Sequence, residues 1–452
     1  MGVGPRVVNF PNCFQGANIF CQGLVLINNF QRRWPMFQFI RKCCCGLDVH
    51  KRVIWACLLI VQDNGVIAKT KRRFSTMTKD LLKLRDWLED NNCTDVVMES
   101  TGVYWKPIYN ILEDLAAITL ANARQVKGLP GRKTDVTDSE WLAQMHLCGL
   151  VRASYIPSRP IRDLRDLTRY RRSLVSDANA EKNRIEKFLE DANIKLSAVV
   201  SDIWGVSSRE MLEALISGGY TPEDMAKFAR GRMRNKIAEL KDALTGKFTD
   251  HHRFMLTQCM QHIQDLEKRI EVVEERIRER LKDYPEVYEC LMSVPFLGET
   301  SVAGIMAEMG VELSGFPSAA QMASWAGLCP GNNESAGKRK SGKKRHGNKY
   351  LESLLTEVSW AAVRCKDTYL QTKFKRLAYR RGAKKAIIAI AHTNVKMLYH
   401  IIKERVCYLE PEPQPLTEQQ KQKILNKHLK ALERLGYKID VNTLASTALE
   451  TA

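Results

Sequence analysis

Hydrophobic and polar residues follow a clear period only from residue 46 onward, where the pattern predicts a mixed α/β domain. Two β-rich runs flank Asp-Asn-Gly, which is a strong hairpin-turn signal. The expected elements are β-rich runs at 46–62 and 66–74, a helix at 78–92, a strand at 95–100, a helix at 104–116 and a strand at 118–123. A hairpin followed by alternating helices and strands indicates a mixed sheet with helices packed on it, over residues 46–154.

Helix formers and alternating charge dominate residues 155–290 and predict a helical region. Apolar residues within 261–281 step by three and four residues, like the a and d positions of two heptads. They are Ile263, Leu266, Ile270, Val273 and Ile277. This spacing suits an antiparallel hairpin or a dimeric coiled coil, and it equally suits one amphipathic helix on a bundle.

Residues 291–406 are expected to form a mostly helical C-terminal domain. Helical stretches surround a Pro and Gly turn at 295–298, as in hairpins that present backbone amides to phosphate. A loop rich in Gly, Asn and Lys follows at 329–350, and two amphipathic helices come after it. Residues 407–452 are interpreted as a linker and a charged helix that adds little to the core.

Residues 1–45 form an atypical N-terminal extension. The first 35 have no clear helical or strand period and lack the basic-then-apolar layout of a signal peptide. Met36 follows directly, so we expect translation to begin there.

The charge balance changes the picture more than the length does. At 452 residues, 44% hydrophobic and 27% charged, the chain suits an ordinary globular protein of two or three domains. Lys and Arg outnumber Asp and Glu by 70 to 51, a formal charge of +19. Such an excess indicates a polyanionic partner, because cations that neutralise phosphates release condensed counterions. Ribosomal or membrane-surface attachment would give the same total, so charge indicates a partner class and no activity.

The 13 cysteines include no Cys-x-x-Cys pair with a partner at zinc spacing. Cys57, Cys93 and Cys148 lie in apolar runs and are expected to be buried thiols, as in a reduced, cytoplasmic protein. Three adjacent cysteines at 43–45 cannot readily form one metal cage. No run of 18 apolar residues exists, so no membrane-spanning segment is predicted.

Four carboxylates recur where the predicted sheet meets its edge. Asp48 lies within the first strand, Glu99 ends the strand at 95–100, and Asp135 and Asp138 begin the next helix. A carboxylate in an apolar strand is costly unless it is paired, protonated or bound to a metal. Four converging carboxylates are what a two-metal phosphoryl-transfer site needs, and such an all-oxygen site suits Mg²⁺ or Mn²⁺.

Each acid also has a structural interpretation. The pair at the helix start is three residues apart and can face one ion, but Thr137 and Glu140 form a T-x-x-E capping box there. Asp48 could face solvent on an edge strand, and Glu99 could cap the helix that follows it. The order of the acids, in a strand, at a strand end and at a helix start, favours the metal site.

Five segments in one order within 46–405 resemble the transposases of bacterial insertion sequences that carry a DEDD acidic tetrad. They are GLDVHKR, VVMESTGVYW, RKTDVTDSEWLA, SVPFLGETSVAGIMAEMG and WAGLCPGNNESAGKRKSGKKRHGNKYL. The resemblance implies an RNase H-like (RuvC-like) domain of the Holliday-junction resolvase type, a helical stalk and a small C-terminal transposase domain. It further implies a metal-binding tetrad of Asp48, Glu99, Asp135 and Asp138, and a structured guide RNA that pairs with donor and target DNA.

The resemblance also implies a nucleophilic serine, matched by Ser335 five residues after Pro330. Its flexible loop is rich in cations that would stabilise phosphoryl oxygens, whereas no neighbouring His or Asp obviously accepts its proton. A carboxylate site from the other domain would supply that base. Ser341 is a rival in the same loop, and composition does not separate the two. The residues expected to contact nucleic acid are Arg132, Lys133, Arg169, Arg171, Arg172, Lys338, Arg339, Lys340, Lys343, Lys344 and Arg345.

The sequence features are compatible with three functions. The first is an RNA-guided DNA transposase in the bacterial cytoplasm, at the nucleoid, that recombines double-stranded DNA as a dimer or tetramer through Ser335. The second is a junction-resolving, metal-dependent nuclease that uses the same tetrad with water as the nucleophile. The third is an RNA-binding scaffold in which the acids are structural caps, and it does not explain an acid inside an apolar strand.

Overall fold

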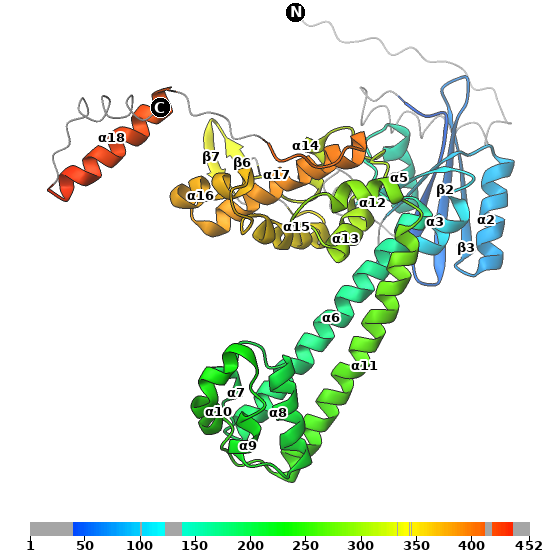
Figure 1. The fold of residues 1–452 in the computed structure, drawn as a ribbon. Coiled ribbons are helices and arrows are strands. Elements are labelled where there is room, and N and C mark those ends of the chain that lie inside the picture. Colours follow the sequence, from blue (N-terminus) through cyan, green and yellow to red (C-terminus); the bar gives the residue numbers. More distant parts are fainter. Residues whose placement is uncertain are drawn as a thin grey trace, which may run out of the picture. The chain divides into compact units, whose positions relative to one another are not determined.

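A computed structural model describes residues 39–99, 102–122, 138–331, 333–342, 344, 346–411 and 418–436. The chain divides into two compact units, of which the first ends at Ile156 and the second begins at Pro157 (Figure 1). No helix of the described ranges is both long and apolar enough to cross a membrane.

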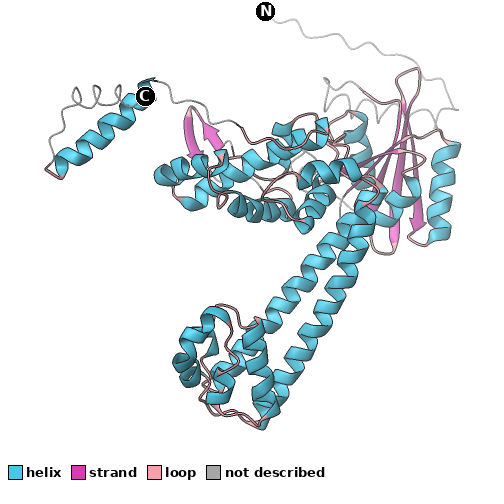
Figure 2. Cartoon of the chain, in the orientation of Figure 1, coloured by secondary structure: helices cyan, strands magenta, loops and turns pink. Residues whose placement is uncertain are grey.

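The first unit is a five-stranded mixed sheet with helices on both faces (Figures 1 and 2). Its elements are β1 (Cys43–Val49), β2 (Val53–Val61), β3 (Ile67–Ser75), α2 (Thr78–Asp90), β4 (Asp95–Glu99), α3 (Trp105–Leu112), β5 (Ala117–Ala121) and α5 (Asp138–Leu147). The strand order is β3-β2-β1-β4-β5. Strands β1 to β3 pair in antiparallel fashion, whereas β4 and β5 run parallel to β1. The predicted mixed sheet with packed helices is confirmed.

The predicted β-rich run at 46–62 contains two strands instead of one. A tight turn over 50–52 separates them, and the His50 amide donates to the Val53 carbonyl at 2.9 Å. The sequence concealed this turn because it holds His, Lys and Arg, with none of the Gly, Pro or Asn residues that mark turns. Strand β1 also begins earlier than expected, at Cys43.

Alternation along β1 divides the core between the two faces of the sheet. Cys45, Leu47 and Val49 pack with α2 and α3, while Cys44 packs with α5 on the opposite face. Neighbouring cysteines therefore belong to different cores, so the run at 43–45 cannot form one cage. Cys57, Cys93 and Cys148 are buried and free, as predicted, and every described cysteine is a free thiol.

Gly46 sets how closely α5 approaches the sheet. A Cβ atom at this position would lie 2.1 Å from the Ser139 carbonyl oxygen and 2.7 Å from the Ala143 amide nitrogen. Further along, the Cys44 thiol donates to the Ala143 carbonyl at 3.3 Å, and the Ile40 amide donates to the Leu147 carbonyl at 3.0 Å. Helix α5 therefore runs opposite to β1, with its first turn over Gly46.

The second unit begins with a long antiparallel helical hairpin. Helix α6 (Arg159–Asp191) packs along α11 (Asp250–Leu281), and Leu174, Ala178 and Leu266 form part of their seam. The two helices run antiparallel, as two contacts show. Arg171 meets Glu274 at one end of the hairpin, and Asp191 meets His252 at the other end. Of the arrangements that the heptad spacing allowed, the chain uses the intramolecular hairpin.

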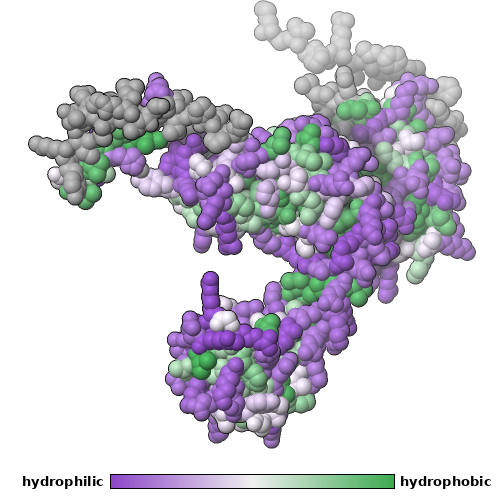
Figure 3. Space-filling view, in the orientation of Figure 1, coloured by the Kyte–Doolittle hydropathy of each residue, from purple (hydrophilic) through white to green (hydrophobic). Residues whose placement is uncertain are grey.

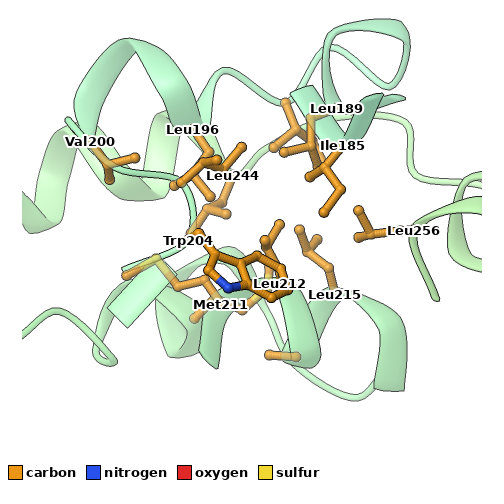
Figure 4. Close-up of a cluster of buried hydrophobic side chains, with 14 of the residues drawn as sticks. Ile185, Leu189, Leu196, Val200, Trp204, Met211, Leu212, Leu215, Leu244 and Leu256 are labelled. Carbon is orange, nitrogen blue, oxygen red and sulfur yellow. The ribbon is translucent and has the colours of Figure 1, made fainter. Parts of the chain in front are cut away.

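A small helical cap joins the far ends of the two long helices (Figure 1). It contains α7 (Leu196–Val199), α8 (Val206–Ser217), α9 (Pro222–Ala226), the 3-10 helix η1 (Gly231–Lys236) and α10 (Ile237–Ala243). Trp204 lies in its core against Met211 and Leu212 (Figure 4). The visible outer surface of the hairpin and cap is largely hydrophilic (Figure 3). The helical region expected at 155–290 is therefore a stalk with its own end core.

The remainder of the second unit is mostly helical, as predicted. Its elements are α12 (Pro285–Met292), α13 (Glu299–Met309), α14 (Ala319–Trp325), β6 (Asn333–Ser335), β7 (Lys338–Ser341), α15 (Lys349–Ala362), α16 (Tyr369–Arg381), α17 (Ala383–Glu404) and α18 (Glu418–Arg434). Helix α17 supplies the central apolar face, where Ile390, Val395 and Leu398 are fully buried. None of the described side chains of α18 is buried.

His146 of α5 makes the stability of the first unit sensitive to acid. Its ring is fully buried, and neither ring nitrogen has a hydrogen-bond partner in the described part of the chain. Burial and the Arg41 guanidinium lower the pKa of His146 to about 4, while Asp95 opposes them. The folded state thus keeps this imidazole neutral at a pH where the unfolded chain binds a proton.

We expect the free energy of unfolding of the first unit to fall by roughly 3 kcal/mol as the pH drops from about 6.5 to 4. The full stability is present above the ordinary histidine pKa and is lost below it. Urea unfolding at several pH values in this range measures how the free energy of unfolding changes with pH. Hydrogen exchange of the sheet amides reports on the first unit alone. His146→Gln should flatten this pH dependence, and replacing the exposed His251 should not. An unchanged slope in His146→Gln would contradict the assignment.

Candidate active site

Asp48 lies on an inner strand of the first unit. Strand β1 has β2 on one side and β4 on the other, so the edge-strand interpretation of Asp48 is wrong. Its side chain is 16% exposed, and one carboxylate oxygen lies 3.1 Å from His50 Nε2. Asp48 alternates with Leu47 and Val49 and therefore faces the α5 side of the sheet.

Glu99 ends the neighbouring parallel strand on the same face. The β1–β4 register pairs Gly46 with Val97 and Leu47 with Met98, so the next residues along the strands are Asp48 and Glu99. Carboxyl ends of adjacent parallel strands lie at one edge of a sheet. The capping interpretation of Glu99 does not hold, because α3 begins at Trp105 and has no side-chain cap bond.

Asp138 reaches the same end of the sheet from α5. It is the first residue of that helix, and the following Ser139 carbonyl lies against Gly46. Since α5 runs opposite to β1, its first turn lies toward the end of the strand that carries Asp48. Three of the four predicted acids thus belong to the carboxyl ends of β1 and β4 and the start of α5. The fourth, Asp135, lies outside the described residues.

The described residues alone do not form a finished metal cage. No group of three His, Cys, Asp or Glu side chains within them converges closely enough to hold a metal ion. Asp48 has a further interaction besides the one with His50, and Asp138 has an interaction as well, so neither residue is without a partner. The chemistry of the acids suits a hard divalent cation, and the site as described lacks one of its predicted ligands.

Glu140 has a different role from the predicted capping box. Its two carboxylate oxygens lie 2.8 Å from Lys69 Nζ and 2.7 Å from Lys71 Nζ, on the outer strand β3. Burial opposes its ionisation, but the two lysines outweigh burial and hold the pKa of Glu140 below its usual value. The other half of the box, Thr137, lies outside the described residues. Glu140 therefore ties the start of α5 to the sheet.

Ser335 lies at the tip of a β-hairpin, where the sequence predicted a flexible loop. Strands β6 and β7 pair Ser335 with Lys338 and enclose the two-residue turn Ala336-Gly337. Both turn residues have positive φ, +50° and +73°, as type I′ hairpin turns require. Ser335 is exposed beside this turn, whereas its rival Ser341 is half-buried at the far end of β7, opposite Asn333.

The predicted stalk arginines are engaged within the protein. Arg169 donates two hydrogen bonds to Glu308, at 2.7 and 2.9 Å. Arg171 contacts Glu274 at 2.6 Å, and Arg172 donates to Ser353 at 2.6 Å while 44% of its side chain stays exposed. These contacts give the three arginines a structural role within the chain. Their contact with nucleic acid stays a prediction.

The basic hairpin, formed by β6 and β7, and the residues after it retain part of the predicted cationic surface. Lys338 and Lys340 are exposed, and Lys344 forms an ion pair with Glu352 of α15. The other predicted contacts, Arg132, Lys133, Lys343, Arg345 and the side chain of Arg339, lie outside the described residues.

Two features escaped the sequence prediction. His50 contacts Asp48, and its position two residues later in GLDVHKR was the available signal. A second cationic surface covers α16 and the start of α17, around Tyr379, whose side chain is 85% exposed. The signal was the absence of Asp and Glu between Asp367 and Glu404. The exposed cations of this α16–α17 surface are Lys375, Arg376, Arg380, Arg381, Lys384 and Lys385.

Acids at one end of a mixed sheet, together with cationic helices and a basic hairpin, are features of enzymes that act on nucleic acids. Comparison with known proteins finds two family models that match parts of the chain. Residues 45–194 match the IS110-type DEDD family model described as "Transposase", and residues 288–375 match the "Transposase IS116/IS110/IS902 family". Two stretches of the chain are therefore similar to transposase domains of the IS110 family, in agreement with the resemblance that the sequence motifs predicted.

A named relative agrees with these domain matches. The chain is 27% identical over 158 residues to the "Probable family 20 transposase" of Pseudomonas aeruginosa. The matched stretch is 34% of this chain and 46% of the relative, so the alignment spans about half of that protein.

Gly46 offers a direct test of how the acidic end is built. Gly46→Ala should lower the free energy of unfolding by roughly 1–3 kcal/mol, because its Cβ atom would overlap the backbone of α5. Gly219→Ala is the matched control, since a Cβ atom there meets nothing within 4 Å. Urea unfolding measures both variants. Equal stability of the two would show that α5 does not depend on this contact.

Proposed function

We propose that this chain is a DNA transposase of an insertion sequence that cuts and joins DNA with a metal-dependent acidic tetrad and a serine nucleophile. The observation that carries the proposal is the placement of Asp48, Glu99 and Asp138 at one end of the sheet, in a chain with two transposase domains. Asp135 completes the proposed tetrad. The mixed sheet, with β1 flanked by an antiparallel and a parallel strand, also supports an RNase H-like assignment of the first unit.

The carboxylates would hold Mg²⁺, or Mn²⁺ in its place, through hard oxygen ligands. A bound divalent ion neutralises charge on the phosphate and stabilises the leaving oxygen. The chain's own contribution is rigidity: Gly46 seats α5 on β1, and Glu140 fastens α5 to Lys69 and Lys71. These contacts keep Asp138 close to the strand ends before any ligand binds.

Ser335 is the proposed nucleophile because it is exposed at the tip of a two-stranded hairpin with cations on the adjoining strand. Its Oγ would form a bond to a DNA phosphorus while one phosphoester bond to a deoxyribose oxygen breaks. The proton that the serine loses would pass through a base to the leaving deoxyribose oxygen, which departs as a hydroxyl. Lys338 and Lys340 would stabilise charge on the phosphoryl oxygens. We further propose that a structured guide RNA selects the DNA, and that a dimer or tetramer carries out strand exchange.

A covalent protein–DNA adduct is the decisive observation. The protein is incubated with DNA and RNA from the sequences flanking its gene, with Mg²⁺, and separated by denaturing electrophoresis. We expect an adduct that disappears in Ser335→Ala and in Asp48→Asn and persists in Ser341→Ala. Cleaved DNA without an adduct would indicate hydrolysis by water, as in a junction-resolving nuclease. An Asp48→Asn variant with full activity would overturn the metal site.

The α16–α17 surface should contribute to nucleic-acid affinity. Replacing Arg376, Arg380 and Arg381 with Ala should weaken binding to any sequence and reduce the slope of log affinity against log salt by roughly 2–3. Exposed cations on the stalk and cap provide the matched triple replacement, namely Lys187, Lys247 and Arg269. Fluorescence anisotropy over a salt series measures the slopes. Equal losses in the two triple variants would show that only total charge matters.

A further inference from the structure

Glu308 is a buried carboxylate at the junction of three segments of the second unit. It belongs to α13, and only 3% of the residue is exposed. Arg169 of the stalk helix α6 donates to both of its oxygens, at 2.7 and 2.9 Å. Asn348, just before α15, donates its side-chain amide to Glu308 at 2.6 Å. One carboxylate thus joins the stalk to the residue that caps α15, the helix that follows the β6–β7 hairpin in the chain.

The stalk side of this junction has a second anchor. Arg165 donates to the Ala307 carbonyl at 2.9 Å and to the Glu308 carbonyl at 3.0 Å, and its guanidinium lies 3.6 Å from the Glu308 carboxylate. Arg169 also lies over the ring of Tyr350, 4.1 Å from its centroid. The stalk is therefore held both to α13 and to the first turn of α15.

The hairpin side is held by Asn348 and the glycine before it. The side-chain oxygen of Asn348 caps α15 by accepting hydrogen bonds from the backbone amides of Tyr350 and Leu351, at 3.0 and 3.3 Å. The backbone amide of Asn348 donates to the Trp325 carbonyl. A Cβ atom on Gly347 would lie 2.3 Å from the Gly327 amide nitrogen. The two ends of the segment that carries the hairpin thus meet at this point.

The junction is not closely packed on every side. A cavity of about 440 Å³ lies beside it, between α6, α11, α13 and α15, and Glu308, Arg169 and Tyr350 are in its wall. Buried ion pairs often add little net stability over apolar residues, because both charges lose their hydration. Their best-attested use is to select one arrangement among several that pack equally well. An ionic junction beside a cavity fits that use.

We propose that Glu308 is a positioning residue for Ser335. By joining Arg169 and Asn348, it fixes one end of the segment that carries the β6–β7 hairpin relative to the stalk, and thereby fixes where the hairpin presents its serine. This inference rests on the proposed function of Ser335, although its structural part is testable without any DNA reaction.

The structural test compares hydrogen exchange of the whole protein with that of Glu308→Gln, which keeps the size of the side chain and removes its charge. Faster exchange is expected at the amides of 333–351, with the sheet of the first unit and α8 of the cap unchanged. Glu357→Gln is the matched control, because Glu357 also meets a stalk arginine, Arg172, but is 68% exposed. Unchanged exchange at 333–351 in Glu308→Gln, or an equal change in Glu357→Gln, overturns the proposal.

The functional test measures the rate of adduct formation and the affinity for DNA in the same variants. Glu308→Gln should slow adduct formation by about tenfold or more while affinity stays within about twofold, because misplacement affects the reaction geometry more than phosphate binding. Glu308→Asp should restore part of the rate. A lower unfolding temperature with an unchanged adduct rate would reduce Glu308 to a structural role and overturn the proposal.

Failure of the variant to fold and failure of the serine mechanism can each be told apart from failure of the Glu308 proposal. If Glu308→Gln does not fold, Arg169→Lys replaces it, since lysine keeps the charge but loses the two parallel hydrogen bonds. If the unaltered protein forms no adduct, the serine mechanism fails, and the hydrogen-exchange comparison still decides whether Glu308 fixes the hairpin.

Discussion

The close approach of α5 to β1 at Gly46 is the constraint on which the acidic end of the first unit depends. Side chains in a strand alternate between faces, so Asp48 and Glu99 share a face because their strands run parallel with matched register. That face is useful for binding only if another element closes over it at the same end. Helix α5 does so without a Cβ atom between its backbone and the strand, and Asp138 is its first residue.

Ionic contacts at Glu308 hold the stalk of the second unit to its C-terminal helices. Arg165 and Arg169 give this contact a defined geometry, because a bidentate guanidinium–carboxylate pair restrains both distance and orientation. Each unit thus combines a close backbone approach at a glycine, Gly46 or Gly347, with ion pairs that fasten the neighbouring element.

Sequence patterns predicted the sheet, the stalk and the positions of Asp48, Glu99 and Asp138 at element ends, because each rests on periodicity or on position at an element end. They missed what depends on tertiary contacts. The turn at 50–52 has no turn-forming residue, and Ala336 adopts a left-handed conformation that alanine rarely takes, so the hairpin around Ser335 looked like a loop. The capping box at Thr137 and Glu140 was a local pattern, whereas Lys69 and Lys71 reach Glu140 from β3.

The arginines show why net charge indicates a partner and not a site. Arg169 and Arg171 contribute to the charge of +19, yet each faces a carboxylate of its own chain and their two pairs are locally neutral. Exposed cations of α16 and the start of α17 lie in a stretch without Asp or Glu, and none of them forms an ion pair within the described residues. A phosphate backbone responds to the local field within about 10 Å at moderate salt. The distribution of acids therefore decides which cations remain available to nucleic acid: the acid-free stretch of α16 and α17 is visible in the sequence, whereas the pairing of Arg169 and Arg171 with distant carboxylates appears only once the chain is folded.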